Sequence, residues 1–141
     1  RSARIFAGIS LAAGKREKEA LLALVADAGY RVIDMSDDEM AKLHVRYMVG
    51  GHAHGLQHER LFRFEFPERP GALLRFLEAV GAHWNISLFH YRNHGSDYGR
   101  VLAGVQVAPA DGERFAGHLN ELGYVYTEET DNPAYRMFLG D

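Results

Sequence analysis

The 141-residue sequence contains no cysteine and has three lysines. The absence of cysteine excludes disulfide bonds and thiol catalysis, and it fits a reducing compartment. Catalysis through a Schiff base needs a lysine, ideally in an apolar pocket. Lys15, Lys18 and Lys42 instead fall on charged helical segments. We therefore expect no lysine-based active site.

Long apolar runs and basic blocks are absent as well. No run approaches the roughly 20 apolar residues of a membrane span, and no charged and then apolar leader opens the chain. The formal net charge is −3, and without a basic block this argues against a nucleic-acid partner. We expect a cytoplasmic protein that binds neither membrane nor nucleic acid. Because the chain starts at Arg1 without methionine, we also expect it to be a piece of a longer protein.

Known catalytic motifs are missing too. The sequence has no nucleophile elbow, no definable carboxylate pair and no glycine-rich phosphate loop. Of the eight histidines, His52, His54 and His58 lie in a linker-like stretch, which explains them without a metal. His90 is expected to be a hydrogen-bonded structural residue. We predict no catalytic residue, no bound cofactor and no metal in this chain.

One stretch organises the second half of the chain. Three phenylalanines alternate with charged residues over 62–66, which predicts a strand with one buried face. Pro67 cannot donate to a strand ladder, and Pro70 suits the first position of a helix. Gly71 lets a ligand or another backbone approach the first free amides of that helix, which attract a carboxylate. An ordinary strand-to-helix connection explains the same residues equally well. The apolar stripe of the predicted helix is Leu73, Leu77, Val80 and Trp84.

The chain also contains an internal repeat. Residues 4–11 match 100–107 at an offset of 96, and Gly29-Tyr30 matches Gly123-Tyr124 at 94. Each copy reads as strand, helix, Gly-Tyr, strand, acidic turn and short apolar tail. The second copy is preceded by a further strand, helix and strand over 60–92, for which the first copy has no counterpart.

The periodicities predict an α+β chain in which a complete module follows a partial one. The first part has strands at 3–12 and 30–35, a helix at 15–28 with 21–25 inward, a capping box at 36–39 and a short apolar strand or tail at 45–49. The second part has the order βαββαβ of a ferredoxin-like fold, with its first and third strands central and two helices on one face. We place a partial βαβ module at 1–51, a linker at 52–58 and a complete module at 59–141.

RNA-binding modules share the βαββαβ order. They need exposed aromatic residues on the central strands with basic residues around them. The predicted third strand, 100–107, has no aromatic residue. We therefore reject this interpretation.

Several long segments resemble the C-terminal regulatory region of biosynthetic threonine dehydratase, also called threonine ammonia-lyase or threonine deaminase. These segments are 36–51, 64–77, 84–92, 97–103, 120–124 and 132–134. The resemblance covers nearly the whole chain outside the linker and the loop at 109–112. It implies that both modules are ACT-like.

The resemblance implies a function for the parent enzyme. In that family a pyridoxal-phosphate domain converts L-threonine to 2-oxobutanoate and ammonia on the route to isoleucine. Two ACT-like modules bind isoleucine as inhibitor and valine as activator, and the enzyme is typically a tetramer. This chain lacks the catalytic domain with its cofactor lysine, so we expect a regulatory fragment whose partners are that domain, the two effectors and further copies of the chain.

Carried onto this sequence, the resemblance places the effector at the turn after the phenylalanine-rich strand. A carboxylate can bind the amides of 71–73, an ammonium group Asn85 or strand carbonyls, and a branched side chain Leu73, Leu77 and Phe89. Leu73 and Leu77 serve equally well as core residues. The predicted site residues are Pro70, Gly71, Ala72, Leu73, Leu74, Leu77, Asn85, Ile86, Ser87, Leu88 and Phe89.

Two functions remain open from the sequence. One is an amino-acid-sensing regulatory fragment, and the other is a structural assembly domain without ligand binding. The strand at 3–12 has no neighbours from its own module, so we expect it to pair with the other module or with a second chain. This predicts a dimer built on a continued sheet.

Overall fold

The structure, a computed structural model, describes residues 5–12, 14–45, 55–93, 95 and 97–139. The predicted linker histidines His52 and His54, and residues 46–49 of the predicted apolar strand, lie outside these ranges. The elements in chain order are α1 (Gly14–Asp27), α2 (Glu39–Leu43), β1 (Glu59–Pro67), α3 (Ala72–Gly81), β2 (Asn85–Arg92), β3 (Tyr98–Gln106), η2 (Pro109–Asp111), α4 (Gly112–Leu122), β4 (Val125–Glu128) and α5 (Pro133–Phe138).

The four strands form one antiparallel sheet of order β2-β3-β1-β4. β1 pairs with β3 along its whole length, from the rung at Glu59 to the rung at Pro67, and with β4 over 62–65. Pairing on both sides satisfies the backbone groups of the central strands. The predicted order of elements over 59–128 and the central position of the first and third strands are confirmed.

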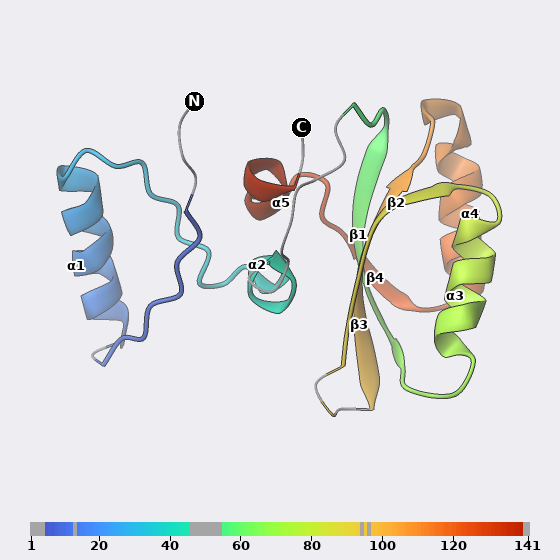
Figure 1. The fold of residues 1–141 in the computed structure, drawn as a ribbon, viewed down its shortest axis with the longest axis horizontal. Helices are drawn as coiled ribbons and strands as arrows, with labels where there is room; N and C mark the ends of the chain where they lie inside the picture. The colour runs from blue at the N-terminus through green and yellow to red at the C-terminus, as the bar shows by residue number, and fades with distance from the viewer. Residues whose placement is uncertain (1–4, 13, 46–54, 94, 96, 140–141) are drawn as a thin grey trace.

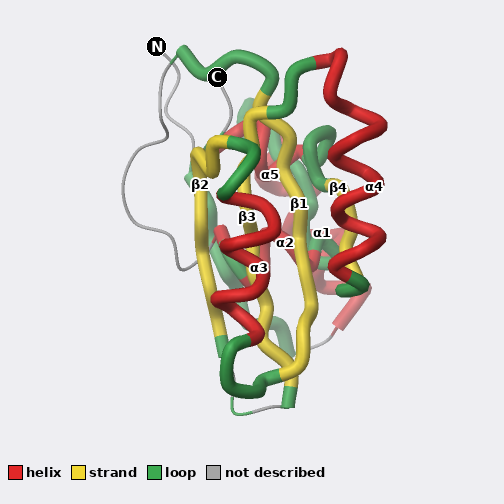
Figure 2. Tube along the Cα trace, turned by 90° about the vertical axis from the view of Figure 1, so that its right-hand side faces the viewer, coloured by secondary structure: helices red, strands yellow, loops and turns green. Residues whose placement is uncertain are grey.

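Helices cover both faces of the sheet (Figures 1 and 2). α3 and α4 lie on one face, and α2 and α5 lie on the other, with α1 further out beyond α2. The predicted pair of helices on one face of the sheet is confirmed by α3 and α4, whereas the layer of α2 and α5 on the other face was not predicted. This second layer forms because the polar side of β1 also carries apolar residues: Leu61 of β1 and Leu102 of β3 are both fully buried on the side of α2 and α5.

The larger core lies between the sheet and the helices α3 and α4. The alternating phenylalanines of β1, which include Phe62 and Phe64, are buried there. The Phe64 ring lies 4.8 Å from Phe76 of α3, and the Phe62 ring lies 5.2 Å from Phe115 of α4. Burying each such ring contributes about 1.5–3 kcal/mol. The predicted strand with one phenylalanine face is confirmed.

The inner stripe of α3 differs from the predicted one. Ala72, Phe76 and Val80 are buried, whereas Leu77 is 37% exposed. The helix sequence has apolar residues on two adjoining stripes, so its periodicity does not decide which of the two stripes faces the sheet. Contact of Phe76 with the phenylalanines of β1 selects one of them. Of the predicted stripe, Val80 and Trp84 are buried, and Leu73 is partly buried against the core.

The first part of the chain forms less structure than predicted. Among the described residues, 5–12 and 30–35 contain no strand. Most side chains in these segments are exposed, including Ile5 at 84% and Tyr30 at 71%, although Phe6 and Met35 are half-buried against the core of α2 and α5. A strand needs a hydrogen-bonded neighbour, and none of the described strands pairs with these segments.

The predicted helix at 15–28 is confirmed as α1, and Gly29 follows it with the left-handed φ of 84° expected of a cap. Of the residues predicted to face inward, Leu21, Leu22 and Val25 are half-buried and Leu24 is exposed, so α1 contributes no buried residue to a core. The short helix α2 is also present, but its N-cap is Asp38, whose side chain accepts from Ala41 N at 2.9 Å. The predicted capping box starting at Ser36 is therefore wrong.

Candidate functional site

The turn from β1 into α3 is held by backbone hydrogen bonds. Glu68 N donates to Asp97 O at 2.7 Å, and Arg69 N donates to Pro67 O at 3.0 Å. Gly71 is the N-cap of α3, with a left-handed φ of 83° that favours glycine. Pro70 therefore precedes the helix and does not occupy its first position.

The sequence predicted free amides at 71–73, and this is wrong for one of them. Ala72 N donates to Arg69 O at 3.1 Å, so this amide is already occupied. No side chain caps the first turn of α3, and the amides of Leu73 and Leu74 are the ones left for an anion among the described residues.

Several predicted site residues lie on α3 at and after this turn, and Phe89 lies further along the sheet, on the β2 rung that continues to Phe62 of β1. Leu74 and Leu77 of α3 are exposed, and Leu73 is half-buried. Phe89 of β2 is 38% exposed, and its ring lies 6.2 Å from Phe76 of α3. The arrangement offers an apolar surface next to uncapped helical amides.

The other predicted residues of β2 do not reach the turn. Asn85 is paired with Gln106 in β3, at the end of the sheet opposite to the Pro67 rung, and its Nδ2 donates to Gln106 Oε1 at 2.6 Å. A register shift lies between Ile86 and Leu88. Ile86 packs with the core of α3 and α4, Ser87 Oγ donates to Glu59, and Leu88 packs on the opposite face of the sheet.

Two tyrosines that the sequence did not assign to the site support the turn. Tyr124 OH donates to Ala72 O at 3.4 Å, and its ring lies 5.2 Å from Phe66. Tyr91 OH donates to Glu68, and this hydrogen bond raises the pKa of the tyrosine. The alternation of β2 and the repeated Gly-Tyr pair were the signals that could have placed them here.

Comparison with known proteins identifies the family of the chain. Residues 50–139 match the family model described as the C-terminal regulatory domain of threonine dehydratase. The chain belongs to this family. The resemblance seen in the sequence segments is thereby confirmed, and the matched region is the regulatory part of such enzymes and not the catalytic part.

Relatives of this regulatory domain come from bacteria, fungi and a plant. The chain is 59% identical over 140 residues to L-threonine dehydratase biosynthetic IlvA of Escherichia coli strain K12, and 54% identical over 139 residues to that of Salmonella typhimurium. It is 47% identical over 137 residues to the mitochondrial threonine dehydratase of Saccharomyces cerevisiae. The matches cover 97–99% of the chain but 24–27% of each relative, so the chain spans about a quarter of their length.

A histidine pair lies on the other face of the regulatory domain. His44, which follows α2, and His90 of β2 have their Nδ1 atoms 2.9 Å apart, so one ring donates and the other accepts. Burial, and then the positive charges of His90 and Arg63, lower the pKa of His44 to about 3. Burial and then Arg92 lower the pKa of His90. The prediction that His90 is a hydrogen-bonded structural histidine is confirmed.

The described residues contain little else that resembles a reactive centre. Lys18 Nζ pairs with Asp34 at 2.8 Å, and Lys15 lies 3.9 Å from Glu19, as expected of lysines on charged helices. No group of three or more metal-binding side chains occurs in the described part of the chain. Among the same residues, every helix is too short or too polar to cross a bilayer.

Proposed function

We propose that this regulatory domain binds a branched-chain amino acid at the turn between β1 and α3, with isoleucine and valine as the effectors. The observation that carries the proposal is the combination of an uncapped helix start with exposed apolar side chains on the same helix, against which Phe89 of β2 packs at Phe76. A helix start suits a carboxylate, and an apolar surface suits a branched side chain.

Each part of an amino acid has a candidate partner at the turn. The amides of Leu73 and Leu74 suit the carboxylate, and Leu77 and Phe89 suit the side chain. Asn85 lies too far along the sheet for the ammonium group. Glu68 replaces it in the proposal, because its carboxylate is part of the turn and already accepts from Tyr91.

Isoleucine and valine differ by one methylene, which is worth only about 1–3 kcal/mol in an apolar pocket. A single site of fixed shape therefore cannot give them opposite effects. Opposite effects require two sites, or two conformations that prefer different effectors.

The proposal extends to the longer protein. By its family, the parent enzyme is a pyridoxal-phosphate-dependent threonine ammonia-lyase that makes 2-oxobutanoate and ammonia, and this chain regulates its catalytic domain in a homo-oligomer. The division into a partial module at 1–51, a linker at 52–58 and a complete module at 59–141 is part of the same proposal. All four described strands fall within 59–128, which supports it. A cytoplasmic location stays a prediction, since the yeast relative is named mitochondrial.

Calorimetric titration with isoleucine and valine tests the function. We expect saturable heat for at least one effector, and Leu73→Phe should weaken its binding about tenfold or more, because the larger ring fills the space beside the uncapped amides. Val125→Phe is the matched control, since Val125 is exposed on β4. Unchanged affinity in Leu73→Phe removes this site from the proposal.

The second candidate function is structural assembly without ligand binding. Exposed apolar side chains along the edge strand β2, together with Leu74 and Leu77 of α3, favour it because such surfaces mark interfaces. Flat calorimetric traces for both amino acids, in a protein that still assembles, support this candidate over the first.

A further inference from the structure

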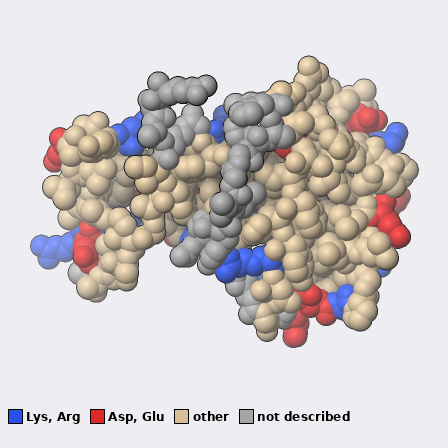
Figure 3. Space-filling model, in the orientation of Figure 1, with Lys and Arg blue, Asp and Glu red and all other residues tan. Residues whose placement is uncertain are grey.

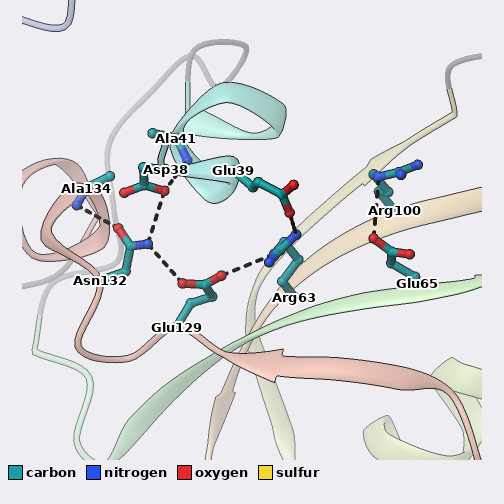
Figure 4. A network of polar contacts seen from close by, with 9 residues as sticks. All are labelled: Asp38, Glu39, Ala41, Arg63, Glu65, Arg100, Glu129, Asn132 and Ala134. Atoms are coloured by element: carbon teal, nitrogen blue, oxygen red, sulfur yellow. Dashed lines mark hydrogen bonds and ion pairs between the residues drawn. The ribbon is translucent and has the colours of Figure 1, made fainter. Parts of the chain in front are cut away.

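A polar network joins α2 to the sheet on the face away from α3 and α4 (Figure 4). The Arg63 guanidinium in β1 donates from Nη1 to Glu39 Oε2 at 2.5 Å and from Nε to Glu129 Oε1 at 3.1 Å. Glu39 is the first residue of α2, and Glu129 follows β4 directly. Arg63 therefore ties the short helix of the first repeat to the sheet of the second.

The network continues from Glu129 to the caps of both short helices. Asn132 Nδ2 donates to Glu129 Oε2 at 2.9 Å and to Asp38 Oδ1 at 3.1 Å. Asp38 caps α2 through Ala41 N, and Asn132 caps α5 through Ala134 N. The two caps are 94 positions apart, which is the spacing of the sequence repeat. Equivalent residues of the two repeats thus bind each other.

Little water reaches the centre of this network. The side chains of Arg63 and Glu129 are 14% and 12% exposed, whereas Glu39 is 60% exposed. Charged hydrogen bonds that are shielded from water are strong, and a carboxylate that loses its cation there is costly. Of the two ion pairs that Arg63 makes, the pair with Glu129 is therefore the more rigid, and the pair with Glu39 is the one that opens to solvent.

The same strand reaches the proposed effector site from its other face. Phe62 and Phe64, on either side of Arg63, point to the larger core, where Phe64 packs on Phe76 of α3. Four residues after Arg63, β1 ends at Pro67 and the turn begins. A movement of α2 therefore displaces Arg63, and with it the strand β1 on which α3 packs.

We propose that Arg63 is a positioning residue that couples the packing of α2 to the geometry of the turn at 67–72. While the Arg63 bridge is intact, α2 of the first repeat and α3 of the second respond together. Its part in effector sensing rests on the proposed function. The coupling between the helices itself requires no ligand, so the two can be tested separately.

Hydrogen exchange of the full-length protein that contains this chain, read by mass spectrometry, tests the coupling. Arg63→Met removes both ionic hydrogen bonds and keeps most of the side-chain length. We expect exchange in α2 and in the first turn of α3 to rise together, by about tenfold or more, because charged hydrogen bonds are lost. The matched control is Arg60→Met. Arg60 binds Glu128 at 2.9 and 2.7 Å within the second repeat, and this pair does not involve α2.

Two results would overturn the proposal: faster exchange in α2 with α3 unchanged, or the same rise in α3 for Arg60→Met. Should Arg63→Met fail to fold, Glu39→Gln removes only the charge of the exposed partner and keeps an acceptor oxygen. It should give the same paired rise at a smaller amplitude, and a rise confined to α2 again overturns the coupling.

The same exchange measurement is repeated with isoleucine present. In the unmodified protein isoleucine should slow exchange in both α2 and α3, and in Arg63→Met in α3 alone. Slowing in both helices of Arg63→Met counts against the coupling. No effect of isoleucine on the unmodified protein counts against the proposed function, while the ligand-free comparison still decides the coupling.

Discussion

Gly71 shows how a single residue shapes the candidate site. It has φ 83° and ψ −7°, and no atom lies within 4 Å of the position that a Cβ would take. The glycine is therefore required by the backbone conformation and not by crowding. This leaves open space directly beside the uncapped amides of α3, where the proposed effector carboxylate would bind.

The buried imidazole of His44 links the stability of the fold to pH. Its folded-state pKa of about 3 lies below the ordinary 6.5. The unfolded chain therefore takes up the proton first as the pH falls. Stability that the neutral pair contributes is fully present above pH 6.5 and is lost progressively towards pH 3. The slope from this one group is about 1.4 kcal/mol per pH unit.

We expect His44→Leu to flatten this pH dependence, since leucine cannot bind a proton. Urea unfolding at pH 7, 6 and 5 measures it, and the difference between variant and parent removes the contribution of carboxylates. His83→Leu, at an exposed histidine, is the control and should keep the parental slope. If the free energy of unfolding depends equally on pH in His44→Leu and in the parent protein, protonation of His44 is not the cause of the loss of stability.

At the scale of elements, the N-cap of α5 shows that a capping residue can also hold distant residues, which local sequence does not reveal. Asn and Asp are about equally good helix N-caps, so local physics predicts that Asn132→Asp is neutral. The structure predicts a loss of about 1–3 kcal/mol in the free energy of unfolding. Aspartate cannot donate to Asp38 and Glu129, and it would place three carboxylates together.

Urea unfolding at pH 7 checks this prediction. Asn85→Asp serves as the control because Asn85 is exposed and makes one side-chain bond, to Gln106, so its loss should not exceed about 1 kcal/mol. Equal, small effects of the two substitutions mean that the contacts of Asn132 to α2 contribute nothing to stability.

The elements also show where sequence periodicity succeeded. The phenylalanine alternation of β1 and the helix predicted at 15–28, with the glycine that follows it, are confirmed because each follows from residue spacing and backbone preference alone. The strands expected at 3–12 and 30–35 are absent from the described residues, because alternation makes a segment suitable for a sheet but cannot supply its neighbour.

At the scale of the whole molecule, β2 lies at one edge of the sheet that the described strands form. The dimer expected from strand 3–12 loses its basis, since the described residues 5–12 form no strand. β2 instead is an edge strand of eight residues with Phe89 and Tyr91 partly exposed on it. Apolar edge strands favour pairing with another chain.

We therefore predict a dimer through β2, which Phe89→Lys should dissociate by placing a charge in the interface. Light scattering at several concentrations measures the mass. Val125→Lys, on the shorter edge strand β4, is the control and should leave the dimer intact. A parent protein that is a monodisperse monomer at high concentration contradicts the prediction.

The sequence by itself determined the order of elements in the second module, the buried face of β1, the repeat and the family. These follow from spacing, backbone preference and long identical segments, which are properties of neighbouring residues. Tertiary structure alone decided the rotation of α3, the placement of Asn85 away from the turn, and the second helical layer with its network around Arg63. Each of these depends on which distant residues share a face or a rung of the sheet, and that is settled only when β1 pairs with β3 and β4.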